Sequence, residues 1–260
     1  MKNSLFIKKT LNFLEYPNWV VSQKIKLSKV IIHRDEIFYE MKSEAGLPTR
    51  FDKIILGFLM QKLFLNESVV NYTLITTRYE IAKNIYSASK SFSKQKYERI
   101  MLALKRWNVM CIRFEDIVSE NGHRSMKYFS VIDSVNLDKN THKLTIQFNQ
   151  DYIKQTKSSM VFNSLDITAY KKCFLECKKL ARPLSMRLYE ILLRNLLDRY
   201  VWCIDISHFA LLLTLEGNQP PSRVLQLLKP AIEEVNKQTH MNIDFDYDKQ
   251  RSLCIFKKRD

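Results

Sequence analysis

Glycine and proline are scarce in this chain, with four and six copies among 260 residues. So few turn-forming residues disfavour an architecture of many tight β-turns, and no Gly/Ser-rich linker marks a domain boundary. The glycines, at positions 46, 57, 122 and 217, are also too dispersed to form a phosphate-binding loop that ends in Lys-Ser or Lys-Thr. A nucleotide-hydrolysing enzyme built on such a loop is therefore not expected.

Long apolar runs are absent as well. No stretch approaches the roughly 18 apolar residues that cross a bilayer, so a membrane span is not expected. Near the start of the chain, Lys8 and Lys9 interrupt the apolar segment that a signal peptide needs, and no small-residue cleavage site follows. We therefore expect a cytoplasmic protein with no membrane partner.

Cysteine and histidine are few and scattered, with five copies of each. An odd number of cysteines spread through apolar segments is typical of reduced core thiols rather than of a disulfide framework. Cys173 and Cys177 could share a helix face, but no Cys or His cluster nearby would complete a tetrahedral zinc site. The histidines stand singly, so the paired-histidine metal motif of a rolling-circle nickase is missing. We expect no metal, no cofactor and no enzymatic activity.

Positive charge, in contrast, is in excess. Lysine and arginine total 42 against 27 acidic residues, which gives a formal net charge of +15, and the sequence pI is about 9.5. Such an excess is typical of proteins that bind polyanions, and nucleic acid is the first partner to consider. A basic protein without a specialised partner has the same composition, so the positions of the charges must distinguish the two.

Three helices are predicted in the first half of the chain. Residues 51–65 carry apolar side chains at helical spacing. Thr77, followed by Glu80, forms a capping box that opens a helix to about residue 86. Residues 94–107 place apolar side chains on one stripe with lysines and arginines around it, which predicts a strongly basic third helix.

Short β-prone runs follow the basic helix, at residues 110–114, 127–132 and 143–148, with Asn121-Gly122 as the first turn signal. We interpret them as the strands of a wing. Three helices, the last beside a β-hairpin, predict a winged helix-turn-helix domain, which places a helix in the major groove and a hairpin on the DNA backbone.

The same order of elements returns in the second half. A helix is predicted at residues 183–197, followed by a β-prone run at 201–204 and by Asp205, which is placed to cap a helix to about residue 215. A helix over residues 222–237, bent or restarted at Pro230, precedes two strands. Those strands are predicted at residues 241–247 and 252–257.

This repetition predicts an α+β fold of two tandem winged-helix domains, each a helix-turn-helix plus a β-hairpin, related by internal pseudo-duplication. We expect an N-terminal arm at residues 1–45, a first winged-helix domain at 46–162 and a second at 163–260. Residues 149–156 and 165–180 are predicted to form helices between the copies, with the boundary near Asn163. The alternative is an α+β protein in which helices and hairpins alternate by chance.

Four segments resemble the replication initiator protein A family and, more broadly, the iteron-binding plasmid initiators with paired winged-helix domains. They are GLPTRFDKIIL at 46–56, YERIMLALKRW at 97–107, RPLSMRLYEIL at 182–192 and LKPAIEEVNKQTHMNIDFDYDKQRSLCIFKK at 228–258. The resemblance spans residues 46–258 and rests on the order of these packing motifs. One departure is EGNQPPS at 216–222, where the closer family has a Ser/Gly-rich turn, so base contacts from that turn are not carried over.

The candidate DNA-binding residues lie on the third helix and wing of each domain. In the first domain we expect base recognition from the start of the third helix, which is the end that usually meets base edges, and phosphate contacts from two flanking lysines. The recognition residues are Lys94, Lys96, Tyr97 and Arg99, and the phosphate contacts are Lys90 and Lys105. In the second domain the recognition residues are Arg223, Gln226 and Lys229, and the wing residues are Lys249, Arg251, Lys257 and Lys258. A merely solvated helix face is the alternative for each helix.

The resemblance implies binding of double-stranded DNA at directly repeated origin sites, assistance in melting adjacent A·T-rich duplex, and recruitment of host helicase machinery. Host initiator or helicase proteins and a second copy of the chain are further candidate partners. A winged-helix transcriptional repressor, which could be the same protein acting on its own promoter, is the main alternative, and a divergent nickase or primase is another. Arg187 and Glu190, three residues apart on a predicted helix, are expected to pair with each other as scaffold.

Overall fold

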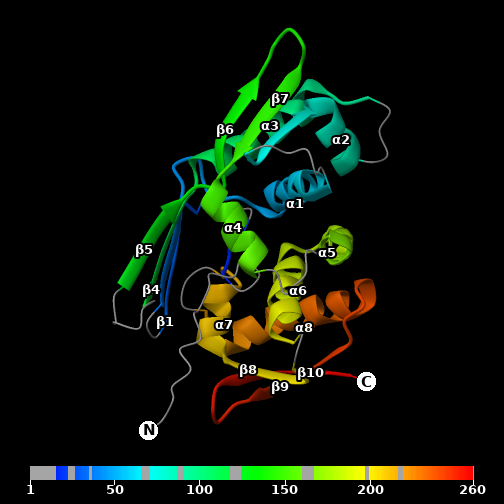
Figure 1. The fold of residues 1–260 in the computed structure, drawn as a ribbon. Coiled ribbons are helices and arrows are strands. Elements are labelled where there is room, and N and C mark those ends of the chain that lie inside the picture. Colours follow the sequence, from blue (N-terminus) through cyan, green and yellow to red (C-terminus); the bar gives the residue numbers. More distant parts are fainter. Residues whose placement is uncertain are drawn as a thin grey trace.

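The computed structural model describes residues 16–22, 27–34, 37–65, 71–86, 91–117, 124–159, 167–196, 199–215 and 219–259. These ranges form helices and antiparallel sheets that alternate along the chain (Figure 1). The helices are α1 (Arg50–Leu65), α2 (Arg78–Tyr86), α3 (Lys94–Val109), α4 (Gln150–Ser159), α5 (Ile167–Lys179), α6 (Pro183–Asn195), α7 (Ile206–Leu212) and α8 (Pro221–Gln238). The strands are β1 (Lys29–Arg34), β2 (Ile37–Lys42), β3 (Thr73–Thr77), β4 (Cys111–Ile117), β5 (Arg124–Phe129), β6 (Ile132–Leu137), β7 (Lys143–Phe148), β8 (Val201–Asp205), β9 (Ile243–Asp248) and β10 (Leu253–Lys258).

The first unit consists of α1, β3, α2 and α3, followed by β6 and β7, and its strands form an antiparallel sheet in the order β3-β7-β6. Thr77 caps α2 as predicted, because the Glu80 N–H donates to Thr77 Oγ1 at 3.1 Å. The return bond of a full capping box is replaced by other contacts, since the Glu80 carboxylate accepts from Thr76 Oγ1 at 2.8 Å and pairs with Lys62. At the start of α1 the Asp52 carboxylate accepts the Thr49 N–H at 2.8 Å, which satisfies one of the N–H groups that a helix start leaves unpaired.

The second unit repeats this order with α6, β8, α7, α8, β9 and β10, and its sheet has the order β8-β10-β9. Asp205 caps α7 as predicted: its carboxylate accepts the N–H groups of Ser207 at 2.9 Å and His208 at 3.0 Å. α8 runs without interruption through Pro230. Each element of the second unit has a counterpart in the first, both in the order along the chain and in the order of the strands in the sheet.

A third sheet corrects the prediction for the first hairpin. Residues 110–114, 127–132 and 143–148 were expected to be wing strands, and the last of them is confirmed as β7. β4 and β5 pair with each other, but they lie in a four-stranded sheet with the order β1-β2-β4-β5, which we call the N-terminal sheet. The hairpin of the first unit is β6–β7. The physical reason is the partner supplied by β2, whose Tyr39 and Met41 pair with Phe114 and Ile112 of β4 and share the buried face of the sheet. The predicted Asn121-Gly122 turn lies outside the described residues.

The segment that precedes this sheet is part of the core. Tyr16, Trp19 and Val20 are buried, and the Val20 N–H donates to the carbonyl of Pro48 at 2.8 Å. The Val21 N–H donates to Thr214 Oγ1, beside the end of α7, at 2.9 Å. This N-terminal segment (residues 16–22) therefore contacts both units.

The two units stack end to end, with α4 and α5 between them and the hairpins β6–β7 and β9–β10 at opposite ends of the molecule (Figure 1). Helices were expected at residues 149–156 and 165–180, and α4 and α5 confirm them. α5 packs closely on α1: a Cβ atom added to Gly57 would lie 2.5 Å from Cδ2 of Phe174. The boundary predicted near Asn163 lies in residues 160–166, which are not described.

The helices pack against the core through apolar side chains on one face. α3 buries Ile100, Ala103, Leu104 and Trp107, and α8 buries a matching stripe that includes Val224, Leu228 and Val235. Among the helices of the described ranges, none combines the length and the continuous hydrophobicity needed to cross a membrane.

Candidate nucleic-acid interface

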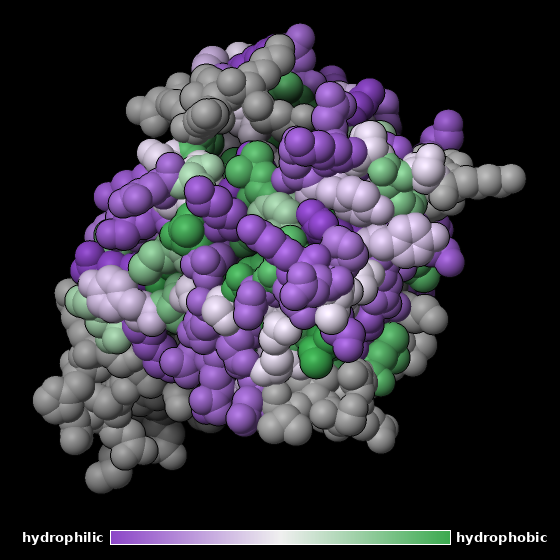
Figure 2. Space-filling model, turned by 90° about the horizontal axis from the view of Figure 1, so that it is seen from above, coloured by the Kyte–Doolittle hydropathy of each residue, from purple (hydrophilic) through white to green (hydrophobic). Residues whose placement is uncertain are grey.

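The first candidate surface is the outer face of α3. Its inner stripe is fully buried, whereas Lys94, Arg99 and Lys105 are exposed. Seen from the end of the molecule at which α2, α3 and the β6–β7 hairpin lie, the surface is mainly hydrophilic with small hydrophobic patches (Figure 2). An exposed basic helix beside a hairpin is the geometry expected of a helix that enters a DNA groove.

Contacts at the C-terminal half of α3 fix its position. The Arg106 guanidinium donates to both carboxylate oxygens of the buried Asp52, at 2.9 and 3.1 Å. The Trp107 indole N–H donates to the Asp52 carbonyl at 2.9 Å, and the Asn108 side chain donates to the carbonyl of Ile132 at 3.0 Å. Because these contacts lie near the end of the helix, its first turns remain available for a partner.

Three predicted recognition residues take part in cation–π contacts, two as cations and Tyr97 as the ring. The Arg99 guanidinium lies 3.9 Å from the ring centre of Phe51, on the side of α3 that faces α1. Lys96 lies over Tyr86 at 4.9 Å, and Tyr97 is half-buried beneath Arg78 at 5.4 Å. Such cation–π contacts contribute about 0.5–1 kcal/mol each at exposed sites and restrict the orientation of the cations. Lys90 lies outside the described residues.

Sequence reasoning missed two polar residues on the outer face of α3, Gln95 and Glu98. Both are exposed, and Glu98 lies 3.8 Å from the Lys94 ammonium. Gln can read adenine and Glu can accept a hydrogen bond from cytosine, so both residues carry chemistry suited to base edges. Helical periodicity places them on the face opposite Ile100 and Leu104, so the sequence alone could have predicted that they are exposed beside Lys94.

A cavity of about 270 Å³ lies between the start of α2, α3 and the turn of the β6–β7 hairpin. It is lined by Thr77, Arg78, Tyr79, Tyr97 and His142. Of these, only Tyr97 was predicted to contact DNA, because no local pattern indicates that the turn before β7 reaches the start of α2. The cavity adds cationic and aromatic groups to the same candidate surface.

The turn of the β6–β7 hairpin is built by Asp138. Its carboxylate accepts the N–H groups of Asn140 at 2.8 Å and Thr141 at 3.3 Å and the Thr141 hydroxyl at 2.6 Å. These hydrogen bonds, the Thr141 hydroxyl first among them, hold the pKa of the Asp138 carboxyl below its usual value. Lys139 and Lys143 are exposed at this turn. They were missed because the turn of the wing was predicted at Asn121-Gly122, between the strands that precede this hairpin.

The second candidate surface is the first half of α8. Arg223, Gln226 and Lys229 are all exposed, and the Arg223 guanidinium donates to Gln226 Oε1 at 2.6 Å. Glu234 turns toward α6 and accepts a hydrogen bond from Ser185 Oγ at 2.6 Å. Glu233 remains exposed.

The four predicted wing residues lie in two pairs, one at each end of the β9–β10 hairpin. Lys249 and Arg251 are exposed at its turn, where the Asp248 carboxylate accepts the Gln250 and Arg251 N–H groups at 3.0 and 3.1 Å. Lys257 and Lys258 lie at the other end of the hairpin, opposite Asp244 and Ile243. The structure therefore brings only Lys249 and Arg251 together at the tip.

Details of the two units match beyond the order of their elements. The Asn236 side chain donates to the carbonyl of Ile243, the first residue of β9, at 2.9 Å, as Asn108 does to Ile132 at the start of β6. Each hairpin turn has an aspartate that accepts the N–H groups two and three positions ahead. Four positions after that aspartate, His142 and Ser252 have positive φ angles of 57° and 55°.

The cysteine pair and the predicted scaffold pair lie in the interior. A hydrogen bond with Cys173, together with burial, raises the pKa of the Cys177 thiol. No group of three or more His, Cys, Asp or Glu side chains suited to a metal ion occurs within the described part of the chain. The predicted pairing of Arg187 with Glu190 is confirmed, at 3.1 Å between Nη1 and Oε2, with both side chains buried.

Comparison with known proteins gives structural but not sequence matches: no family model and no curated protein matches the chain. A crystal structure of a selenomethionine derivative of domains 2 and 3 of RctB is similar with a TM-score of 0.59 at 12% identity, covering 95% of this chain and 97% of that chain. A second structure of RctB domains 2–3 gives a TM-score of 0.52 at 12% identity, covering 93% and 95%. The Pi initiator protein in complex with iteron DNA gives 0.48 at 13% identity, covering 90% and 98%.

The two RctB structures show that their fold is shared over nearly the whole of this chain. The similarity is one of fold, because the identity is only 12%.

Proposed function

We propose that the chain is a cytoplasmic, sequence-specific DNA-binding protein that recognises directly repeated sites in a plasmid-type replication origin and so initiates replication. Its two units are, in this proposal, tandem winged-helix domains that arose by internal duplication. α3 and α8 enter the grooves, and the hairpins β6–β7 and β9–β10 contact the flanking backbone.

The observation that carries the proposal is the repeated unit with its basic exposed helix. The same helix and strand order occurs twice, and in each copy an asparagine of the third helix bonds to the first strand of the hairpin. Each third helix buries its apolar stripe and leaves lysines or arginines in solvent. A net charge of +15 supports a polyanionic partner.

The proposed DNA contacts fall into two groups, contacts to base edges and contacts to phosphates. Side chains on the first turns of the third helices can reach base edges, and we assign recognition there to Lys94, Gln95, Arg223 and Gln226. Cations at the hairpin turns are assigned to phosphates, because wings are expected to contact the DNA backbone. These are Lys139, Lys143, Lys249 and Arg251.

We propose no enzymatic step for this chain. Melting of the origin would follow from DNA binding and bending, and unwinding would be left to recruited host proteins, a host initiator or a helicase. A second copy of the chain is a further partner under this proposal. The end-to-end stacking of the units (Figure 1) supports two separate contacts along one stretch of duplex.

Footprinting on DNA from the chain's own replicon, at controlled salt concentration, tests the function. We expect protection of several tandem sites in the same orientation. One inverted repeat within a promoter would instead indicate a repressor dimer. Nicked circles or a covalent protein–DNA product after incubation of supercoiled origin DNA with Mg²⁺ or Mn²⁺ would indicate a nickase, and both results would contradict the proposal.

A further inference from the structure

One peptide group lies between the two units and contacts both of them. It joins Leu180 to Ala181, in the connection between α5 and α6 (residues 180–182), and we call it the junction peptide. Its carbonyl accepts two hydrogen bonds from the Arg50 guanidinium of α1, at 3.0 Å from Nε and 2.5 Å from Nη2. Its N–H donates to Oε1 of Glu234 in α8 at 2.5 Å. Because a peptide group is planar and rigid, it holds α1 of the first unit and α8 of the second in a fixed relation.

Glu234 fixes the middle of α8 against this connection. Its other carboxylate oxygen, Oε2, accepts from the Ser185 hydroxyl at 2.6 Å. One turn earlier in α8, the carbonyl of Pro230 accepts from the Arg182 guanidinium at 2.8 Å. Hydrogen bonds that involve a charged group are about twice as strong as neutral ones. These contacts therefore restrict the movement of α8 relative to residues 180–182.

The first turn of α1 also holds α3. Asp52, two positions after Arg50, is fully buried. Its carboxylate accepts from the Arg106 guanidinium of α3, and its carbonyl accepts from the Trp107 indole. Burial lowers the pKa of the Arg50 guanidinium, and the Glu234 carboxylate acts in the opposite direction, so the charge on α8 acts on α1 across the junction peptide. A continuous series of polar contacts thus connects α3 to α8.

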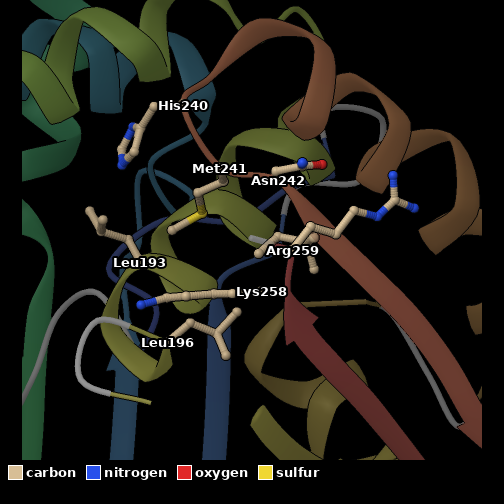
Figure 3. Close-up of a pocket in the computed structure, with 8 residues that line it drawn as sticks. Leu193, Leu196, His240, Met241, Asn242, Lys258 and Arg259 are labelled. Atoms are coloured by element: carbon tan, nitrogen blue, oxygen red, sulfur yellow. The ribbon is translucent and has the colours of Figure 1, made fainter. Parts of the chain in front are cut away.

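The end of α8 is held to α5 as well. Nδ1 of His240, in the connection that follows α8, lies 2.7 Å from Oε2 of Glu176 in α5. The Tyr189 hydroxyl of α6 donates to the same oxygen. Figure 3 shows His240 in this connection, where it lines a cavity of about 210 Å³ together with Leu193 of α6. α8 is therefore fixed both at its middle, through Glu234, and beyond its end.

From these contacts we infer that Arg50 and Glu234 are positioning residues that fix the separation of α3 and α8, so that the chain selects DNA sites by the spacing between their two contact regions. The inference rests on the proposed function, in which both helices enter grooves of one duplex. Each inserted base pair moves one contact region by about 3.4 Å along the duplex axis and turns it by about 35°. Two helices that are fixed to each other cannot follow this change, whereas two hinged units can.

Titrations with two duplexes test the inference. One carries the site that footprinting of the wild-type chain defines, and the other has one base pair inserted between the two protected regions. The ratio of the two dissociation constants is the spacing penalty, and a general loss of affinity cancels from it. We expect a penalty of about 30-fold for the wild-type chain and of less than about tenfold for Arg50→Ala and for Glu234→Ala. The double variant should match the single variants, because both side chains bind the junction peptide.

Two controls separate positioning from general stability. Glu233→Ala removes the adjacent, exposed carboxylate of α8 and should keep the full penalty. Ile146→Val, in the buried core of the first unit, lowers stability without a change at the junction peptide and should keep it too. A reduced penalty in either control, or the full penalty in both Arg50→Ala and Glu234→Ala, would overturn the inference.

A measurement without DNA separates the inference from the proposed function. Spin-labelled amino acids are incorporated by nonsense suppression at Leu102 of α3 and Lys237 of α8, which are both exposed. Pulsed electron paramagnetic resonance should give one narrow distance distribution that broadens in Arg50→Ala and Glu234→Ala but not in Glu233→Ala. A broad distribution in the wild-type chain, or equal widths in all variants, would contradict the fixed separation. The absence of any footprint would contradict the proposed function, and the distances would still decide whether the separation of α3 and α8 is fixed.

Discussion

The indole N–H of Trp19 donates a hydrogen bond to Oε2 of Glu190 at 2.9 Å, although 171 positions separate the two residues. Glu190 also accepts from Arg187 at 3.1 Å and pairs with the Lys53 ammonium at 3.1 Å. Lys53 belongs to α1 of the first unit and Glu190 to α6 of the second. One buried carboxylate therefore joins the N-terminal segment, the first unit and the second unit.

Removing this charge should destabilise the whole chain. Burial opposes the protonated form of Lys53, yet the Glu190 carboxylate raises the pKa of Lys53 above its usual value, so the pair depends on both charges. We expect Glu190→Gln to lower the free energy of unfolding by about 3–5 kcal/mol and Trp19→Phe by about 1–3 kcal/mol, measured by urea denaturation. Tyr200→Phe, at an exposed ring, is the control, with a change below about 0.5 kcal/mol. A Glu190→Gln loss no larger than that of the control would contradict this role.

The close approach of α1 and α5 predicts a steric effect at Gly57. Gly57→Ala should cost about 1–3 kcal/mol because the new methyl group collides with the Phe174 ring. Phe174→Leu should recover part of this loss in the double variant. Thermal or urea denaturation of the two single variants and the double variant gives the coupling energy. Strictly additive effects would show that the ring is not the cause.

The hairpin assignment predicts which lysines contact phosphate, if the proposed function holds. Lys139→Ala and Lys143→Ala should each reduce the slope of log K against log salt by about 0.9, the value for one lost phosphate contact. Lys127→Ala, on an exposed position of β5 in the N-terminal sheet, should leave the slope unchanged. Titrations of duplex DNA at several salt concentrations measure this. A slope change with Lys127→Ala alone would move the contact to β5.

The position of Arg99 on Phe51 makes its role testable. If Arg99 reads a base from this stacked position, Arg99→Ala should weaken specific binding by about 1–3 kcal/mol. Arg99→Lys should also weaken specific binding, because lysine lacks the planar group that stacks and donates bidentately. Equal losses on specific and random duplexes would instead identify a phosphate contact.

Acid should weaken the first unit through Glu80. Burial alone would raise the pKa of the Glu80 carboxyl, but hydrogen bonds from Lys62 and Thr76 hold it below its usual value. Its folded pKa is thus below the unfolded value of about 4.3, so its stabilising contribution is present above that value and is lost as the pH falls through the folded pKa. Glu80→Gln should be less stable than the wild-type chain at pH 7, and the difference should shrink at pH 3. A difference independent of pH would contradict this sign, and the exposed Glu233→Gln serves as control.

Helices, caps and the repeated order of elements were determined by the sequence itself, because they depend on neighbours only a few positions away. The apolar stripe of α3, the cap by Thr77 and the cap by Asp205 are local patterns, and the structure confirms each of them. The exposure of Lys94 and Arg223 follows from helical periodicity, and that of Lys249 from its position in the turn between β9 and β10.

Pairing between distant strands was decided only by the tertiary structure. β4 pairs with its hairpin neighbour β5 and also with β2, whose residues lie about 70 positions earlier, and the alternation of the β4 side chains does not reveal this second partner. Burial of the Tyr39 and Met41 face of β2 against β4 places β4 and β5 in the N-terminal sheet. The hairpin of the first unit is therefore β6–β7, with Lys139 and Lys143 at its turn. Likewise, the contact of Trp19 with Glu190 and the cavity over Leu193 exist only once distant segments pack, since no short-range pattern encodes a neighbour from the other end of the chain.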